Sequence, residues 1–448
     1  MEWEEIAPGH WSRRLDSIES FFHSMSSVVS PTGITHAMVS VGATLPQKVD
    51  CSLGNLQKTW KSLRYRHPRI ASSAKDGKLY YSAPNELELA QWLSKTLIVD
   101  PHGVSSLDVL ATLESTGTGV LVFLPRTREI FFQISHDHID GIGAMMFLQQ
   151  LLTALKDPPA DVTFGDEHKN LSNSLSHVLG QSPLSSLSSS SPLNPSRASR
   201  ASSPSSELQT TNANGMTHPS VSRSSSLSLI CKAVSRPSFA VRLERLEFSP
   251  SETDQIRTRA HYHGITVTHA CHSAVIQALF HLSEGAANTY TSLIFVDLRR
   301  RLRQTSDHEQ SPVSVHMNAV PVVLPACWRG FIPLAQSLKD VYTKSSGEAH
   351  HAAWHNPIYP FHSQEPSCTG SPQVQVSSLG VVHEHFDHDV DDFWIGGGSA
   401  TADLTTYIWT FKGRLTLAVW YNDAFYEEAV VKLFLQTARS MLVAGLGL

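Results

Sequence analysis

One stretch of the sequence joins a strand pattern to the start of a helix, and it reads Glu129-Ile130-Phe131-Phe132-Gln133-Ile134-Ser135-His136-Asp137-His138-Ile139-Asp140-Gly141. Alternate residues of a strand share a face, so His136 ends the apolar row that begins at Ile130. An imidazole in this position can meet a substrate hydroxyl, and its ordinary pKa of about 6.5 lets it accept a proton at neutral pH. We therefore predict that His136 is a catalytic base.

Asp140 and Gly141 have separate expected tasks. Asp140 is expected to cap the following helix, because an Asp side chain accepts hydrogen bonds from the unpaired N–H groups of a first turn. Gly141 removes a side chain beside it and permits close backbone packing. A histidine at a strand end and a capping aspartate also occur together without any catalysis, so the motif alone leaves both interpretations open.

The same residues allow a second chemistry. His136, His138 and Asp140 match the HxHxD pattern that opens the zinc site of metallo-β-lactamase-like hydrolases. The histidine-rich run at 383–389 could supply further ligands. However, Gly141 stands where that pattern has another histidine, which removes a second-metal ligand. We therefore predict no metal, and we keep the zinc hydrolase as an alternative.

Clear helix and strand patterns surround the motif. A hairpin is predicted from strands 120–124 and 129–135, with a turn at 125–128. Apolar residues at helical spacing predict a helix over 142–155, which Pro158-Pro159 ends. A further helix is predicted over 52–66, capped by Ser52.

The second half of the sequence repeats this alternation of strands and helices. We predict a helix through 270–282 and strands at 292–296 and 319–324. The second strand contains Pro321, which favours an edge position or an irregular position in the sheet. A hairpin is predicted from 404–411 and 414–421 around Lys412-Gly413, and a closing helix over 427–443. This mixture predicts an α/β or α+β fold with mixed sheets.

A serine-rich stretch divides the chain. The chain has 448 residues, long enough for two cores. Residues 181–228 are dominated by Ser, with Pro, Asn and Thr, and contain too few large apolar side chains to offset the entropy of ordering. We predict an N-terminal domain over 1–175, a flexible linker or insertion over 176–235 and a C-terminal domain over 236–448. Regulation of the linker by phosphorylation is a further alternative.

Composition narrows the functional class. The net charge is −5 and the pI about 6.6, which differs from the strongly basic profile of a nucleic-acid binder. Five scattered cysteines without CxxC spacing fit a reducing compartment. The acidic start has no signal-peptide pattern, and no window approaches the ~20 apolar residues that a membrane span needs. We therefore expect a cytoplasmic protein that binds neither nucleic acid nor membrane.

Further motifs occur in order along nearly the whole chain outside the serine-rich stretch. In sequence order they are the segments 11–16 (WSRRLD), 136–141 (HDHIDG), 264–270 (GITVTHA), 297–302 (DLRRRL), 317–318 (MN), 377–380 (SSLG) and 414–417 (RLTL). With them the chain resembles the superfamily of CoA-dependent acyltransferases and condensation domains, which includes the BAHD enzymes. The nearest resemblance is to fungal O-acetyltransferases of secondary metabolism, such as those acting on trichothecenes. Residues 392–397 (DFWIGG) depart from the DFGWG motif of the plant BAHD branch.

The resemblance implies a fold and a set of site residues. It implies two chloramphenicol-acetyltransferase-like sandwich domains with the active site at their interface. His136 would be the general base, and Asp140 would have a structural role and pair with Arg299. Residues that would line the substrate site are Gly141, Asn318, Ser377, Ser378 and Trp394.

The resemblance also implies a reaction. The chain would be an acyltransferase that transfers groups other than aminoacyl groups, acting as a monomer. It would move an acyl group, in the first instance acetyl from acetyl-CoA, to a hydroxyl of a small hydroxylated natural product, with no bound cofactor. A stand-alone condensation enzyme that uses carrier-bound acyl groups is an alternative, although Ser135 stands where many condensation domains have a second histidine.

Overall fold

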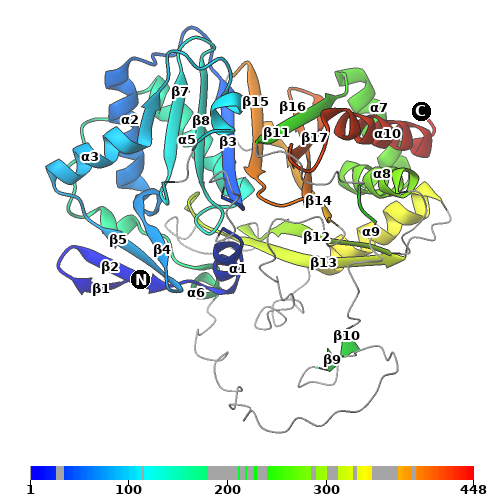
Figure 1. Cartoon of the computed structure of the whole chain (residues 1–448), viewed down its shortest axis with the longest axis horizontal. Helices are drawn as coiled ribbons and strands as arrows, with labels where there is room; N and C mark the ends of the chain where they lie inside the picture. Colours follow the sequence, from blue (N-terminus) through cyan, green and yellow to red (C-terminus); the bar gives the residue numbers. More distant parts are fainter. Residues whose placement is uncertain are drawn as a thin grey trace.

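The computed structural model describes residues 2–26, 35–113, 116–179, 210–211, 217–218, 227–229, 240–283, 289–299, 311–325, 330–345, 372–384 and 390–448. Two large sheets with their helices stand side by side in these residues, one on each side of Figure 1. Most of the predicted linker 176–235 lies outside the described residues. Within it, only the two-residue strands β9 (Thr210–Thr211) and β10 (Thr217–His218) pair with each other.

The first large sheet has five strands and is mixed. Its order is β15 (Asp392–Gly398), β3 (Met38–Thr44), β8 (Glu129–Ser135), β7 (Val120–Leu124) and β6 (Leu97–Val99). Only β6 and β7 are parallel. The predicted hairpin is confirmed residue for residue in β7 and β8, because its apolar residues pair across the tight turn.

Helices α2 (Leu53–Arg66) and α5 (Gly141–Lys156) pack against this sheet and against each other. The indole of Trp60 on α2 meets the rings of Phe132 and Phe147 edge-on. Ser52 caps α2 through its side chain, as predicted. Burial of these aromatic side chains holds the start of α5 rigidly beside the end of β8.

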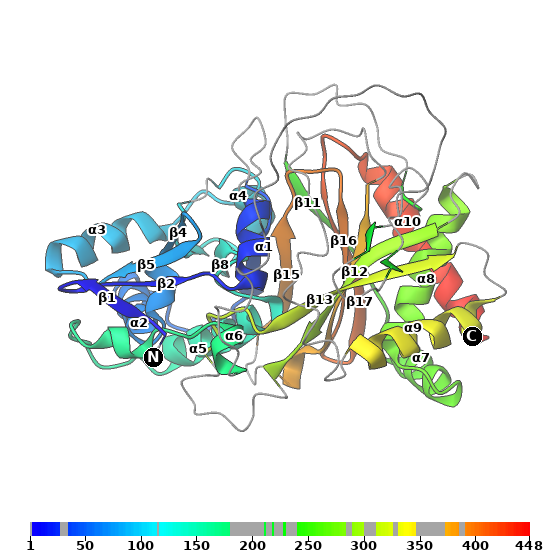
Figure 2. The ribbon, with the colours of Figure 1, turned by 90° about the horizontal axis from the view of Figure 1, so that it is seen from below.

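A small antiparallel sheet lies at the N-terminal edge of this half. Its order is β1 (Glu4–Ala7), β2 (His10–Arg14), β5 (Lys78–Ser82) and β4 (Ser73–Lys75). The chain then forms α1 (Ser17–Ser26), which lies between the two halves in both Figure 1 and Figure 2. The remaining helices of this half are α3 (Glu86–Thr96), α4 (Ser106–Leu110) and α6 (Leu175–Val178).

The second large sheet has six strands. Its order is β11 (Val241–Glu247), β17 (Arg414–Asn422), β16 (Leu404–Phe411), β14 (Val374–Val381), β12 (Thr289–Asp297) and β13 (Met317–Pro325). The pairs β14–β16 and β12–β14 are parallel. Of the two positions predicted for the strand with Pro321, an edge or an irregular one, the structure shows the edge, because β13 is the last strand of this order.

Four helices cover one face of the second sheet (Figure 1). They are α7 (Pro250–Tyr262), α8 (Val267–Leu282), α9 (Phe331–Ser345) and α10 (Glu428–Leu446). Among the described helices, α10 alone is long and apolar enough to span a membrane by length and composition. Its side chains Phe434 and Leu442 are buried in the core of this half, so one face of the helix packs against the protein.

One predicted boundary needs correction, and one strand pairing was not predicted. The closing helix was predicted over 427–443, but it begins at Glu428 and continues to Leu446, where Gly447 ends it in the left-handed conformation. Residues 392–397 form the strand β15, which leaves the second half and pairs with β3 of the first sheet. The sequence does not show this crossover, because the pairing joins residues about 350 positions apart.

Candidate active site

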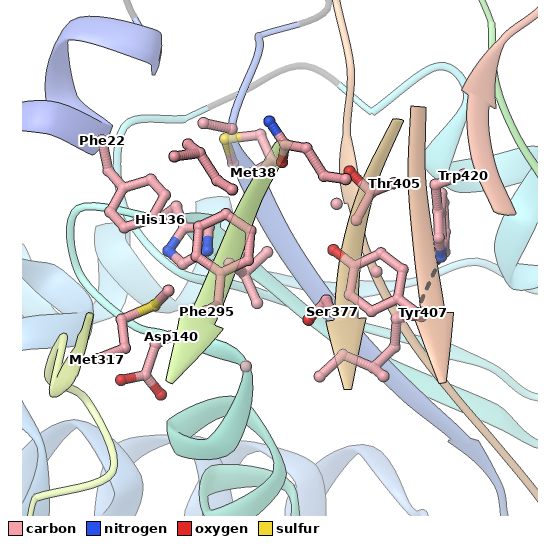
Figure 3. Close-up of a pocket in the computed structure, with 18 of the residues that line it drawn as sticks. Phe22, Met38, His136, Asp140, Phe295, Met317, Ser377, Thr405, Tyr407 and Trp420 are labelled. Atoms are coloured by element: carbon pink, nitrogen blue, oxygen red, sulfur yellow. Dashed lines mark hydrogen bonds between the residues drawn. The ribbon is translucent and has the colours of Figure 1, made fainter. Parts of the chain in front are cut away.

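A pocket lies between the two large sheets and is lined by residues of α1, β3, the start of α5 and strands of the second sheet (Figure 3). One wall is apolar and comes mainly from α1, β12 and β13. Another carries hydroxyl and amide groups from β14 and β16. Its lining includes Phe21, Phe22, Met25, His36, Met38, His136, Gly141, Phe295, Met317, Gln375, Ser377, Ser378, Thr405, Tyr407 and Trp420.

His136 lies in this pocket directly after β8. Its backbone N–H donates to the carbonyl of Ala37 at 2.9 Å, which extends the β3–β8 pairing by one step. The ring of Phe22 on α1 stacks on the imidazole, with ring centres 3.7 Å apart and planes 3° from parallel. Burial lowers the pKa of His136, against the effects of backbone hydrogen bonding and of the nearby Asp140 and Asp137. The imidazole is therefore neutral at pH 7 and has a lone pair available for a proton.

Asp140 caps α5 and faces the protein with both carboxylate oxygens. Oδ1 accepts from the backbone N–H of Gly143 and Oδ2 from that of His316, at 2.8 and 2.7 Å. Nη1 of Arg299 donates to both oxygens at 2.8 Å. Burial by itself raises the pKa of Asp140, but Arg299 and these hydrogen bonds outweigh it and lower the pKa. Asp140 is thus a permanent anion with its lone pairs engaged.

Arg299 follows β12 and ties this strand to the motif. It also contacts Asp297 at 3.1 Å and donates to the carbonyl of Ser314 at 3.2 Å. Burial would lower the pKa of Arg299, but Asp140 and Asp297 raise it. The guanidinium therefore stays charged and links residues 159 positions apart in the sequence.

The glycine that this contact requires is Gly143. A Cβ there would lie 2.2 Å from the carbonyl oxygen of Pro312 and 2.9 Å from Nη2 of Arg299. A Cβ at Gly141 would meet the side chains of Leu379 at 3.2 Å and Ile395 at 3.9 Å. The close packing that the sequence suggested for Gly141 is therefore stronger two residues later.

The imidazole of His138 belongs to a different network. Its Nδ1 is 2.5 Å from Asp137, and its Nε2 is 3.2 Å from the carbonyl of Ser72. His23 on α1 holds the other oxygen of Asp137 at 2.8 Å. His136 faces the pocket, His138 faces Asp137, and Asp140 faces Arg299. The three side chains of the zinc alternative thus diverge rather than converge on one point.

A second buried ionic cluster fixes α1. Glu19 accepts two hydrogen bonds from Arg13, at 2.7 and 2.6 Å, and one from Arg69 at 2.5 Å. Arg69 also donates to the carbonyl of Asp137 at 2.7 Å. Burial raises the pKa of Glu19, but the two guanidinium groups outweigh it and lower the pKa to about 2. This cluster, which the sequence analysis did not identify, holds the helix that carries Phe22.

The structure distributes the other predicted site residues unevenly. Ser377 and Ser378 line the pocket from β14, and Ser378 shares a 2.8 Å hydrogen bond with Thr268. Asn318 is buried in β13, outside the pocket lining. Trp394 packs against Phe131 and Trp420 behind the pocket, because alternate residues of β15 face opposite sides.

The comparisons with known proteins cover the chain from end to end. No family model matches it. The chain is 26% identical to "Acetyltransferase pigO" of Monascus ruber, over 100% of this chain and 99% of that protein. It is 24% identical to "O-acetyltransferase pigM" of the same organism, over 99% of this chain and 87% of that protein.

Solved structures share the fold at lower identity. TRI3 trichothecene 15-O-acetyltransferase from Fusarium sporotrichioides superposes with a TM-score of 0.72 at 17% identity, covering 99% of this chain and 97% of that one. The condensation domain of the Monacolin K polyketide synthase MokA gives a TM-score of 0.57 at 11% identity, with 97% of each chain covered. The protein is therefore an acyltransferase with the fold shared by CoA-dependent acyltransferases and condensation domains. Two of its relatives by sequence are named as acetyltransferases of Monascus ruber.

Proposed function

We propose that this protein is an acyl-CoA-dependent O-acetyltransferase that modifies a hydroxyl of a small secondary metabolite, with His136 as the general base. One observation carries the proposal. A neutral imidazole stands in a pocket between two sheets, and the neighbouring carboxylate of Asp140 is fully occupied by protein contacts. His136 is thereby free to take a proton, and Asp140 serves to hold the turn that presents it.

In the proposed reaction one proton moves twice, first from the acceptor hydroxyl to His136 and then from His136 to the leaving thiolate. The acceptor hydroxyl gives its proton to His136 while its oxygen forms a bond to the acyl carbonyl carbon. The carbonyl oxygen then carries a negative charge, which hydroxyl donors in the pocket can stabilise, with Ser377 as the candidate. Collapse of this intermediate breaks the C–S bond, and the imidazolium returns the proton to the leaving thiolate. The products are the ester and free CoA.

We infer the setting of the reaction from the same relatives. Since the chain is similar to proteins named as acetyltransferases, we propose acetyl-CoA as a co-substrate rather than a bound cofactor, and a small molecule as the acceptor. We propose a cytoplasmic monomer with halves 1–175 and 236–448. The relatives named as O-acetyltransferases favour this reaction over amide formation from carrier-bound acyl groups.

The direct test is incubation of the purified protein with acetyl-CoA and fractionated extracts rich in alcohols. We expect thiol release together with an acceptor that gains the mass of one acetyl group. Malonyl-CoA and an acetylated carrier protein are the matched donors for comparison. Transfer from the carrier protein but not from acetyl-CoA would contradict the proposed donor, and stoichiometric zinc needed for activity would contradict the mechanism.

A further inference from the structure

His36 is a second imidazole in the same pocket. It comes two residues before β3 and is 7% exposed. Its Nδ1 accepts the backbone N–H of Ala400 at 3.2 Å. A neutral imidazole has one donor and one acceptor nitrogen, so this bond places the proton of His36 on Nε2. Within the part of the chain that the structure describes, Nε2 has no hydrogen-bond partner.

The backbone beside His36 is strained. Ala37 has φ = 53°, in the left-handed region that is unfavourable for a residue with a side chain. Its carbonyl accepts the N–H of His136. The backbone conformation of Ala37 therefore positions the adjacent His36 and, through its carbonyl, the backbone of His136. Strain of this kind is retained where the surrounding structure over-determines it, and it clusters at functional sites.

His36 remains uncharged in this environment. Burial lowers its pKa, and a charge on His136 would lower it further, whereas Asp403 acts in the opposite direction. The Asp403 carboxylate itself binds the N–H of Gln373 at 2.7 Å and the hydroxyl of Thr401 at 3.3 Å, so it influences His36 through space. A neutral ring cannot act as an ion-pairing group, and it presents one fixed N–H donor instead.

The other residues that line the pocket indicate which kind of ligand would meet the Nε2–H of His36. The wall built by Phe21, Phe22, Met25, Phe295 and Met317 is apolar and suits an apolar ring system. The wall next to His36 contains Gly396, Gly397 and Gly398 of β15, where the backbone lies bare. A Cβ at Gly397 would lie 2.4 Å from the carbonyl oxygen of Met38. These glycines therefore let β15 lie close against β3, and His36 lines the pocket beside them.

We propose that His36 determines acceptor specificity, donating from Nε2 to a second oxygen of an apolar, ring-containing alcohol, such as a carbonyl near the reacting hydroxyl. This inference rests on the proposed function, because it concerns the acceptor of that reaction. An N–H that is removed from water without a partner is unfavourable. Acceptors that lack the oxygen are disfavoured for this reason. His36 is thus assigned a role in binding, distinct from that of the base.

The test compares two probes that differ in one oxygen. We would measure binding of 2-hydroxy-1-tetralone and 2-tetralol to the full chain without any acyl donor, by calorimetry. Wild-type protein should bind the ketone at least about tenfold more tightly. His36→Leu should bring this ratio close to one. His36→Gln, which keeps a neutral N–H donor, should retain part of it, and circular dichroism checks that each variant is folded.

A matched control uses another polar group of the same pocket. Tyr407→Phe removes a hydroxyl contributed by β16 and should leave the ratio between the probes unchanged. Equal binding of the probes by the wild type, no detectable binding of the ketone, or loss of the ratio in Tyr407→Phe rather than His36→Leu would each overturn the proposal. Because no acyl transfer is measured, a protein that shows the preference but never transfers acetyl would contradict only the proposed function.

Discussion

Two buried carboxylates, Glu19 and Asp140, stabilise the surroundings of His136, and they fix different elements of the fold. Glu19 lies between Arg13 and Arg69 and fixes α1, the helix whose Phe22 covers His136. Asp140 pairs with Arg299 and fixes the start of α5 to the second half of the molecule. Arg299 has a second carboxylate partner in Asp297, whereas Arg69 shares Glu19 with Arg13. We infer that the Glu19 cluster mainly maintains stability and that the Asp140 cluster mainly maintains alignment.

The largest stability effect should follow from Glu19→Ala. This change leaves two buried guanidinium groups without their shared carboxylate, which we expect to lower the free energy of unfolding by about 3–5 kcal/mol. Urea unfolding of the purified variant would measure it. Asp254→Ala, at an exposed ion pair with Arg257, is the matched control and should change stability by less than about 1 kcal/mol. If Glu19→Ala lowered the free energy of unfolding no more than this control, the Glu19 cluster would not be the one that mainly maintains stability.

Asp140→Ala should lower the free energy of unfolding by about 3 kcal/mol, the lower end of the range expected for Glu19→Ala. The effect is smaller because Arg299 retains its ion pair with Asp297. Its effect on activity should exceed that of Glu19→Ala when both are measured on folded protein, since the capped turn next to His136 loses three hydrogen-bonded partners. Kinetics at a temperature well below both melting points would check this. Activity that remained near the wild-type value would show that the Arg299 contact does not align the base.

Phe22→Ala should have a smaller effect than these changes, and it should appear in the pH dependence of activity. Burial lowers the pKa of His136, and removal of the stacked ring exposes the imidazole to water. The pKa should then rise toward its ordinary value of about 6.5. Because the base must be unprotonated, the acid limb of the kcat/KM profile, which reports the free enzyme, should move to higher pH. Phe21→Ala, on the same helix, serves as the control, and a limb that moved to lower pH would contradict the account.

Much of the local structure could be predicted from the sequence, because it depends on neighbours in the chain. The spacing of apolar residues and the capping residues predict α2 and α5. The turn residues predict the hairpin, and Pro321 predicts an edge or irregular position for its strand. The placement of Arg299 came from a family resemblance rather than from any pattern. Glu19, Phe22 and His36 carry no local signal, since their partners lie on distant segments. Trp394 was assigned to the site, but the alternation of β15 turns it behind the pocket.

The most direct test of the central claim is the turnover of His136→Ala beside its melting temperature. General-base catalysis contributes about 10²- to 10⁴-fold, so kcat for acetyl transfer should fall by at least about a hundredfold. The melting temperature should stay within a few degrees of the wild type, because the ionic clusters around Asp140 and Glu19 remain intact. A folded variant that retained near-wild-type kcat would contradict the assignment of His136 as the base.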